Sequence, residues 1–190
     1  KEAKAPEARN TWKSALAEAA FMTGLERNAD VVHMASYAPL FGHVKAWQWR
    51  PDLIWFDNLK SVKSINYYVQ QLYGHNAGTH VLKTTENKAA LTGQDGIYAS
   101  SALDKKKNEI ILKIANVSNE KRTLNYTFTG LKKAERKVTH TILTSADADI
   151  ENTLEKPDAI VPVVSSMLQK DNGFEVEIAP RSFNVYVIKL

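Results

Sequence analysis

The chain of 190 residues contains no cysteine, which excludes disulfides and thiolate metal sites and leaves the cellular compartment open. No apolar run approaches the roughly 20 residues of a membrane-spanning helix, and no signal peptide opens the chain. The polar start, residues 1–7, has the character of a linker or of an arbitrary cut, so the secretion of a parent protein stays open. No internal repeat or low-complexity segment is apparent.

A strong charge of one sign is also lacking. The net charge is +4, and the basic residues are scattered rather than arranged in a stripe. The longest basic runs, residues 105–107 and 132–133, stand beside turn-forming residues. Solvated hairpin tips explain these runs better than a nucleic-acid-binding surface does. The apolar fraction of 44% is ordinary for a soluble globular protein.

Residues 29–41 form a nearly unbroken apolar run that ends beyond a proline. A run that is apolar on both sides is typical of a strand covered on both faces, usually in a parallel sheet. We therefore predict a buried strand around residues 31–35, with His33 as a satisfied core histidine. A parallel strand needs neighbouring strands and crossover helices, and this chain supplies few of either.

Helical spacing of apolar residues predicts a first helix over residues 11–27 and a second from residue 61 or 64 to residue 73. Residues 1–75 thus have the pattern of the tail of an α/β architecture. Residues 76–190 change character, because short segments rich in β-branched residues alternate with turn signals, which predicts an antiparallel, jelly-roll-like sandwich. The strands are expected over residues 79–84, 96–103, 109–115, 122–129, 136–144, 174–178 and 182–190.

Several long motifs resemble α-L-arabinofuranosidases of glycoside hydrolase family 51. They are EAAFMTGLERN at 18–28, DVV at 30–32, MASYAPLF at 34–41, WRPDLIWFDN at 49–58, YYVQQLY at 67–73 and NAG at 76–78. The similarity is dense over residues 15–80 and weaker beyond, where the strand rhythm and APRSF at 179–183 fit.

The resemblance implies a mainly β chain, in which an antiparallel β-sandwich follows a helix–strand–helix remnant of a catalytic (β/α)8 barrel. It places the barrel fragment at residues 1–75, with its strand over residues 30–38, and the sandwich at residues 76–190. It also implies the removal of terminal arabinofuranose from arabinan and arabinoxylan with retention of configuration. Retention needs two carboxyl groups about 5 Å apart, one acting as nucleophile and one as acid/base.

The resemblance places both catalytic glutamates upstream, on barrel strands that this chain lacks. Glu18 and Glu26 lie in the first helix, and Asp57 has no evident carboxylate partner. We therefore expect no catalytic residue in this chain, which alone should be inactive. The dispersed histidines predict no metal site, and no cofactor is expected.

Three aromatic residues are candidate sugar contacts: Tyr37, Trp47 and Trp49. Tyr37 would end the inferred barrel strand, where side chains can face a substrate. The alternative for Tyr37 is packing against the barrel core, and the alternative for each tryptophan is local anchoring of its loop. Some branches of the family carry a substrate-contacting glutamine near Pro39, which proline cannot replace.

The sequence therefore predicts the C-terminal region of a retaining α-L-arabinofuranosidase, with a non-catalytic carbohydrate-binding or structural sandwich as the alternative. The expected partners are an arabinose-containing polysaccharide or oligosaccharide and the missing N-terminal barrel, with no nucleic acid and no membrane. A periplasmic or extracellular parent is expected from the family branch. In the isolated chain, residues 31–37 should be unravelled or paired with another copy, because an exposed apolar edge favours association.

Overall fold

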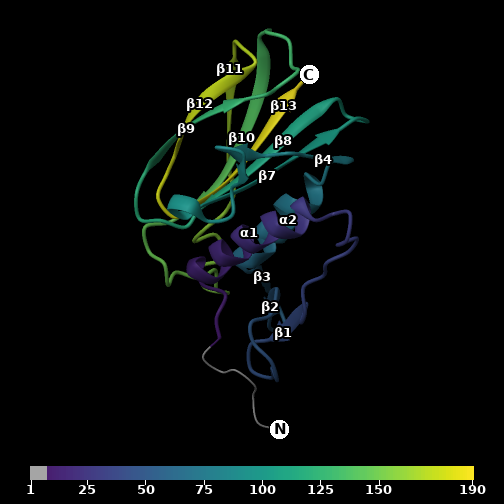
Figure 1. Cartoon of the computed structure of the whole chain (residues 1–190). Helices are drawn as coiled ribbons and strands as arrows, with labels where there is room; N and C mark the ends of the chain where they lie inside the picture. The colour runs from purple at the N-terminus through teal and green to yellow at the C-terminus, as the bar shows by residue number, and fades with distance from the viewer. Residues whose placement is uncertain (1–7) are drawn as a thin grey trace.

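The computed structural model describes residues 8–190 (Figure 1). Two helices and three short strands come first, and the remaining strands follow. The elements are α1 (Trp12–Arg27), β1 (Phe41–His43), β2 (Ile54–Phe56), β3 (Ser61–Lys63), α2 (Ile65–His75), β4 (His80–Leu82), β5 (Thr85–Glu86), β6 (Ala89–Ala90), the 3-10 turn η1 (Gln94–Gly96), β7 (Ile97–Asp104), β8 (Glu109–Asn116), β9 (Arg122–Thr127), β10 (Arg136–Thr144), β11 (Val163–Gln169), β12 (Gly173–Ile178) and β13 (Ser182–Lys189).

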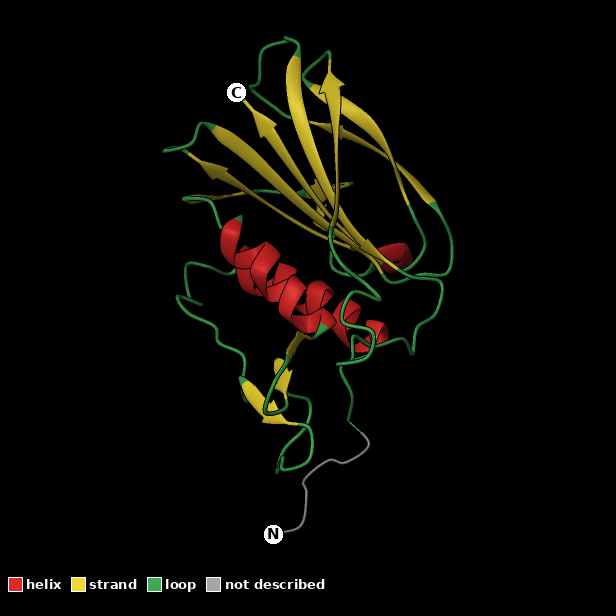
Figure 2. Cartoon of the chain, turned by 180° about the vertical axis from the view of Figure 1, so that it is seen from behind, coloured by secondary structure: helices red, strands yellow, loops and turns green. Residues whose placement is uncertain are grey.

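A six-stranded sheet in the order β11-β10-β13-β8-β7-β4 forms the centre of the molecule. Every neighbouring pair in it is antiparallel. The two-stranded β12–β9 sheet packs against one face, and α1 and α2 cover the other face (Figures 1 and 2). The expected mainly β architecture with an antiparallel sandwich is confirmed.

Strand β8 separates two hydrophobic cores. Ile111 and Ala115 face α1 and α2, while Ile110, Leu112 and Ile114 face the β9–β12 layer. All eight residues of β8 are buried, because successive side chains point to opposite faces and both faces are covered. A central antiparallel strand is therefore buried along its whole length, as is more usual for strands of parallel sheets.

Both helices begin at a side-chain cap and bury one stripe. Thr11 accepts a hydrogen bond from the amide of Ser14, and Ser64 accepts one from the amide of Tyr67. The buried stripe of each helix begins at its first residue, since Trp12 of α1 and Ile65 of α2 are both fully buried. The expected helices are confirmed, with ends shifted by a few residues.

The strand expected over residues 30–38 is not formed, which corrects that prediction. Residues 32–40 run as coil from the end of α1 to β1, and no strand of residues 8–190 pairs with them. Val31 is 77% exposed and Met34 is 88% exposed. His33, expected in a core, is also exposed, and its Nε2 contacts the Asp30 carbonyl at 3.1 Å. A strand needs a neighbour for its backbone groups, and here that neighbour is missing.

The local sheet forms just after this segment instead. Strand β1 pairs in parallel with β2, and β2 pairs antiparallel with β3.

Strand β11 was also not predicted, because residues 145–162 and the strand itself lack an alternating pattern. It lies at the edge of the large sheet, where one neighbour and partial burial are sufficient.

Candidate functional site

Tyr37 is half-buried below the helical layer, at the end of the coil that follows α1. Asn10 Nδ2 donates to its hydroxyl at 3.3 Å, and the hydroxyl donates to the Pro51 carbonyl at 3.5 Å. Burial and the nearby Glu18 carboxylate raise the pKa of Tyr37 to about 12. The phenol is therefore neutral at physiological pH and serves as a hydrogen-bonding group.

The two predicted tryptophans have different environments. Trp47 is half-buried and meets Trp55 of β2 edge to face, with 6.4 Å between the ring centroids. The Arg50 guanidinium lies 4.6 Å from the Trp47 ring centroid and 5.1 Å from that of Trp55. Trp49, by contrast, is 53% exposed. Trp47 therefore has a clear anchoring contact, whereas the Trp49 ring is open to solvent.

A buried amide connects the Tyr37 and Trp47 regions. The Trp55 indole nitrogen donates to Asn10 Oδ1 at 2.9 Å, and Asn10 Nδ2 also donates to Asn66 Oδ1 at 3.0 Å. Asn10 is 4% exposed and Asn66 is 2% exposed, so both amides depend on these partners. This amide chain links the loop that carries Trp47 to Tyr37 and to α2.

The polar chain continues into the seam between the two helices. Asn66 and Gln70 of α2 each donate an amide hydrogen to Glu18 of α1. Burial raises the pKa of Glu18, and the two amide donors oppose that rise. Both carboxylate oxygens of Glu18 are thereby occupied, which favours a structural role.

Asp52 is a second carboxylate beside this chain. It is 3% exposed, and its Oδ2 atom is buried with no hydrogen-bond partner among residues 8–190. Burial raises the pKa of Asp52, and the Arg50 cation opposes the rise. A Cβ placed on Gly42 would lie 2.7 Å from Asp52 Oδ2, so the β1 backbone closes over this carboxylate.

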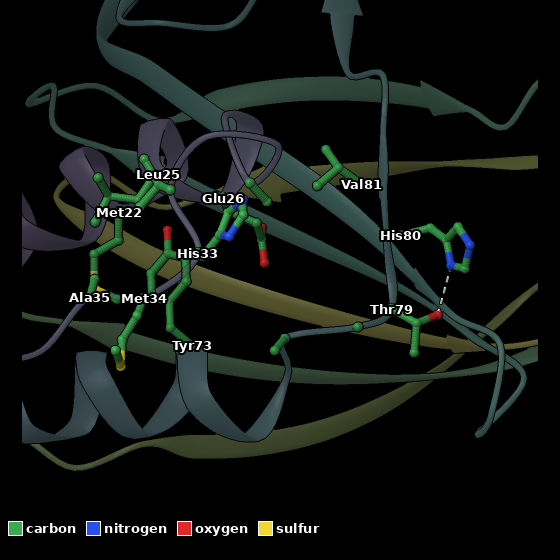
Figure 3. Close-up of a pocket in the computed structure, with 14 residues that line it drawn as sticks. Met22, Leu25, Glu26, His33, Met34, Ala35, Tyr73, Thr79, His80 and Val81 are labelled. Atoms are coloured by element: carbon green, nitrogen blue, oxygen red, sulfur yellow. Dashed lines mark hydrogen bonds between the residues drawn. The ribbon is translucent and has the colours of Figure 1, made fainter.

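A cavity of about 310 Å³ opens where the ends of α1 and α2 approach β4 (Figure 3). Glu26 and His33 lie together at one side, and His80 lies across the cavity. Glu26 is already engaged, because Ser100 Oγ donates to its Oε2 at 2.5 Å and Lys113 Nζ donates to its Oε1 at 2.5 Å. The carboxylate thus neutralises a buried cation, and both of its oxygens have partners.

The part of the chain that the structure describes holds no group of three or more histidine, aspartate or glutamate residues suited to a metal ion. Within the same residues, no helix is long and apolar enough to cross a bilayer. The sequence did not single out Asn66, Gln70 or Asp52. In the sequence each of them is only a polar residue beside an apolar stripe. Their hydrogen-bond partners are brought together by the fold, as Asn10 and Asn66 are from positions 56 residues apart in the chain.

Comparison with known proteins gives a consistent result. The chain matches the family described as "Alpha-L-arabinofuranosidase C-terminal domain" over residues 1–182. An extracellular exo-α-L-arabinofuranosidase of Streptomyces chartreusis is 52% identical over 93 residues, which cover 46% of this chain and 11% of the relative. α-L-Arabinofuranosidase 1 of Arabidopsis thaliana is 32% identical over 179 residues, 91% of this chain and 26% of the relative.

Solved structures agree with these relatives. The arabinose-bound α-L-arabinofuranosidase MgGH51 is 33% identical with a TM-score of 0.85, and the match covers 96% of this chain and 28% of that one. The Thermotoga maritima α-L-arabinofuranosidase, 16% identical with a TM-score of 0.78 over 95% of this chain and 39% of that one, supports the fold alone. The chain thus spans about a quarter of the Arabidopsis and MgGH51 proteins. It belongs to the α-L-arabinofuranosidase C-terminal domain family and corresponds to the C-terminal part of a glycoside hydrolase family 51 arabinofuranosidase.

Proposed function

We propose that this chain is the C-terminal region of a retaining α-L-arabinofuranosidase that removes terminal arabinofuranosyl residues from arabinan- and arabinoxylan-type polysaccharides. The observation that carries the proposal is the match over 96% of the chain, at a TM-score of 0.85 and 33% identity, to an arabinose-bound arabinofuranosidase. The Streptomyces relative is named extracellular, which supports an extracellular or periplasmic parent.

In this proposal, the chain braces a barrel rather than performing the reaction. Residues 1–75 are the barrel fragment and residues 76–190 are the sandwich. The sheet-facing sides of α1 and α2 are buried in the sandwich core. Beyond the helices, Val31 and Met34 are mostly exposed and are suited to contact the rest of a barrel.

The proposal places both catalytic carboxylates outside this chain. Glu18 is held by two amide donors, and Glu26 by Ser100 and Lys113. Neither has the arrangement that a retaining glycosidase needs, in which two carboxyl groups face a sugar about 5 Å apart. The isolated chain is therefore inactive, and Tyr37, Trp47 and Trp49 supply at most substrate contacts.

The test compares the 190-residue chain with a polypeptide extended upstream, each incubated with a chromogenic α-L-arabinofuranoside. We expect hydrolysis by the extended polypeptide alone, and proton NMR of the first-formed sugar should show the retained α-anomer. Hydrolysis by the 190 residues alone would disprove the absence of the carboxylates. A β-anomeric first product would disprove retention.

The alternative is a non-catalytic carbohydrate-binding or structural sandwich, and the exposed Trp49 ring is the observation that favours it. An exposed indole can cover the apolar face of a sugar ring. Affinity electrophoresis in soluble arabinan tests this function, with Trp49→Ala as the variant and Leu59→Ala as the control at another exposed apolar residue. Retardation that is lost only in Trp49→Ala would support binding, and unaltered mobility of the native chain would exclude it.

A further inference from the structure

Strand β11 (Val163–Gln169) ends the order of the six-stranded sheet, and β10 is its ladder partner on one side. Among residues 8–190, no other strand pairs with its outer side. Figures 1 and 2 place this edge at the far end of the sandwich from α1 and α2. The strand therefore presents a row of backbone donors and acceptors to solvent.

The composition of β11 does nothing to block a further strand. Its sequence, VVSSMLQ, contains no charged residue and no proline. Val163, Val164 and Leu168 are 60%, 63% and 61% exposed. Natural sheet edges are usually protected by lysine, proline, a bulge or a short strand, and β11 lacks the first two over its 7 residues.

The opposite edge of the same sheet is protected. Strand β4 (His80–Leu82) has 3 residues, and His80 Nε2 lies 3.1 Å from Lys105 Nζ. Lys83 follows the strand directly. Pro162 and Lys170 likewise flank β11, so the two edges differ in the length of the strand that they offer, 3 residues in β4 against 7 in β11.

We propose that β11 pairs antiparallel with β11 of a second copy of this chain, so that two sandwiches share one continuous sheet. Only one antiparallel register pairs all 7 residues with the copy, and it places Ser166 opposite Ser166 on a twofold axis. In this register Val164 lies opposite Leu168 of the copy, twice by symmetry.

The pairing is self-complementary on one face. Val164, Ser166 and Leu168 share one face of β11, opposite the face on which Met167 packs on the core and Gln169 is 1% exposed. The dimer thus covers two valine–leucine pairs around a central pair of hydroxyls that can hydrogen-bond to each other. Figure 1 places α1, α2 and the short strands β1–β3 toward the opposite end of the molecule from β11.

One strand pair is smaller than a standard protein interface, so we expect a weak dimer that forms with rising concentration. Sedimentation velocity on the 190-residue chain and on the upstream-extended polypeptide, up to about 200 µM, measures its Kd. Val164→Lys/Leu168→Lys sets lysine opposite lysine twice and should weaken association at least tenfold. Val164→Glu/Leu168→Lys sets glutamate opposite lysine in the same register and should retain the dimer.

The control is Val81→Lys/Val117→Lys, which adds the same charge at two exposed valines away from β11 and should leave the Kd unchanged. A native protein that stays monomeric at the highest concentration overturns the proposal. So does a dimer that the double-lysine change at β11 leaves intact, because association would then occur through another surface, such as residues 31–37. Loss of the dimer in the glutamate–lysine variant overturns the register.

Discussion

Lys113 of β8 is a charged residue placed completely inside the molecule. Its side chain is 0% exposed, and its ammonium donates to Glu26 Oε1 at 2.5 Å and to the Asn76 carbonyl at 2.6 Å. The same group lies 5.1 Å from the Tyr73 ring centroid. Burial lowers the pKa of Lys113, and Glu26 opposes that effect. The lysine connects the sheet to both helices, because Glu26 lies in the last turn of α1 and Tyr73 belongs to α2.

Replacing Lys113 by methionine should therefore be strongly destabilising. Removing one member of a buried ion pair leaves the other charge uncompensated, at a cost of about 3–5 kcal/mol of unfolding free energy. Urea unfolding followed by far-UV circular dichroism measures this loss. The double change Glu26→Gln/Lys113→Met should recover a large part of it, since no buried charge then remains. Equal instability of the single and double variants would contradict this account.

Gly42 in β1 is required by close approach rather than by an unusual backbone conformation. A Cβ there would lie 2.7 Å from both Asp52 Oδ2 and the Trp55 ring. Gly42→Ala should therefore cost about 1–3 kcal/mol through overpacking, measured by urea unfolding. Gly74→Ala is the matched control, because nothing lies within 4 Å of a Cβ at this position of α2. It should stabilise the helix by about 0.5–1 kcal/mol. A harmless Gly42→Ala would show that β1 and β2 can separate.

At the scale of elements, the contact between α1 and α2 combines an apolar stripe with a polar seam. Ala15 and Ala19 of α1 and Val69 of α2 are fully buried, while Glu18 bonds Asn66 and Gln70 beside them. The small α1 residues allow close approach, and the carboxylate satisfies two amides that water cannot reach freely. The seam therefore aligns one helix along the other.

Glu18→Ala should cost about 1–3 kcal/mol, because Gln70 loses its acceptor and Asn66 Nδ2 keeps only Ser14 Oγ, at 3.3 Å. Glu18→Gln should cost less, since one carbonyl remains and the Gln70 amide can rotate to accept. Thermal unfolding of both variants at pH 7 tests this order. If Glu18→Gln were as damaging as Glu18→Ala, the charge itself would be essential to the seam.

His140 of β10 provides a pH-dependent contribution at the core of the sandwich. Its ring stacks on Tyr186 with 4.3 Å between centroids, and its Nε2 lies 3.0 Å from Asn184 Oδ1. Burial lowers its pKa from the ordinary 6.5, and the Asn184 contact opposes that shift. The unfolded chain therefore binds a proton at a higher pH than the folded one.

Because a lowered histidine pKa favours the neutral folded state, this contribution is present above pH 6.5 and is lost as the pH falls toward the folded pKa. The unfolding free energy should fall with a slope of at most about 1.4 kcal/mol per pH unit. Glu18 has the opposite effect on the unfolding free energy at lower pH. Its pKa is raised in the folded chain, so the folded state binds a proton more readily than the unfolded state and gains stability as the pH falls. Urea unfolding of the native chain and of His140→Gln between pH 7.5 and 5.5 isolates the contribution of the histidine. If the unfolding free energies of the two proteins change with pH at the same slope, His140 makes no pH-dependent contribution.

At the scale of the whole molecule, the sandwich and the helices form one packed unit. The helices share a core with β8, β10 and β13 through Ile111, Leu143 and Phe183. Tyr73 stacks on Phe183 with 5.3 Å between centroids and 8° between planes. Separating the helical layer from the sheet would expose both surfaces, so unfolding of the two should be cooperative.

This cooperativity can be measured directly. Thermal unfolding followed by near-UV and far-UV circular dichroism should give coincident transitions for residues 8–190. Phe183→Leu, in the shared core, should reduce the unfolding free energy by about 1–3 kcal/mol. The midpoint temperatures measured in the near-UV and the far-UV should then fall together. Val163→Thr at the exposed end of β11 is the control and should change neither. Two separate transitions in the native chain would mean that the layers fold independently.

Local features of the sequence are sufficient to predict the two helices, seven of the strands and the family, because caps, helical spacing, turn residues and contiguous motifs each involve residues close together in the chain. The sequence also selected Tyr37, Trp47 and Trp49, although their contacts with sugar stay predictions. The folded structure was needed to show that residues 30–38 form no strand, that β11 ends the sheet, and that Asn10 and Lys113 are buried among partners. The physical reason is that strand pairing and the burial of polar groups depend on neighbours distant in the chain, which local periodicity does not encode.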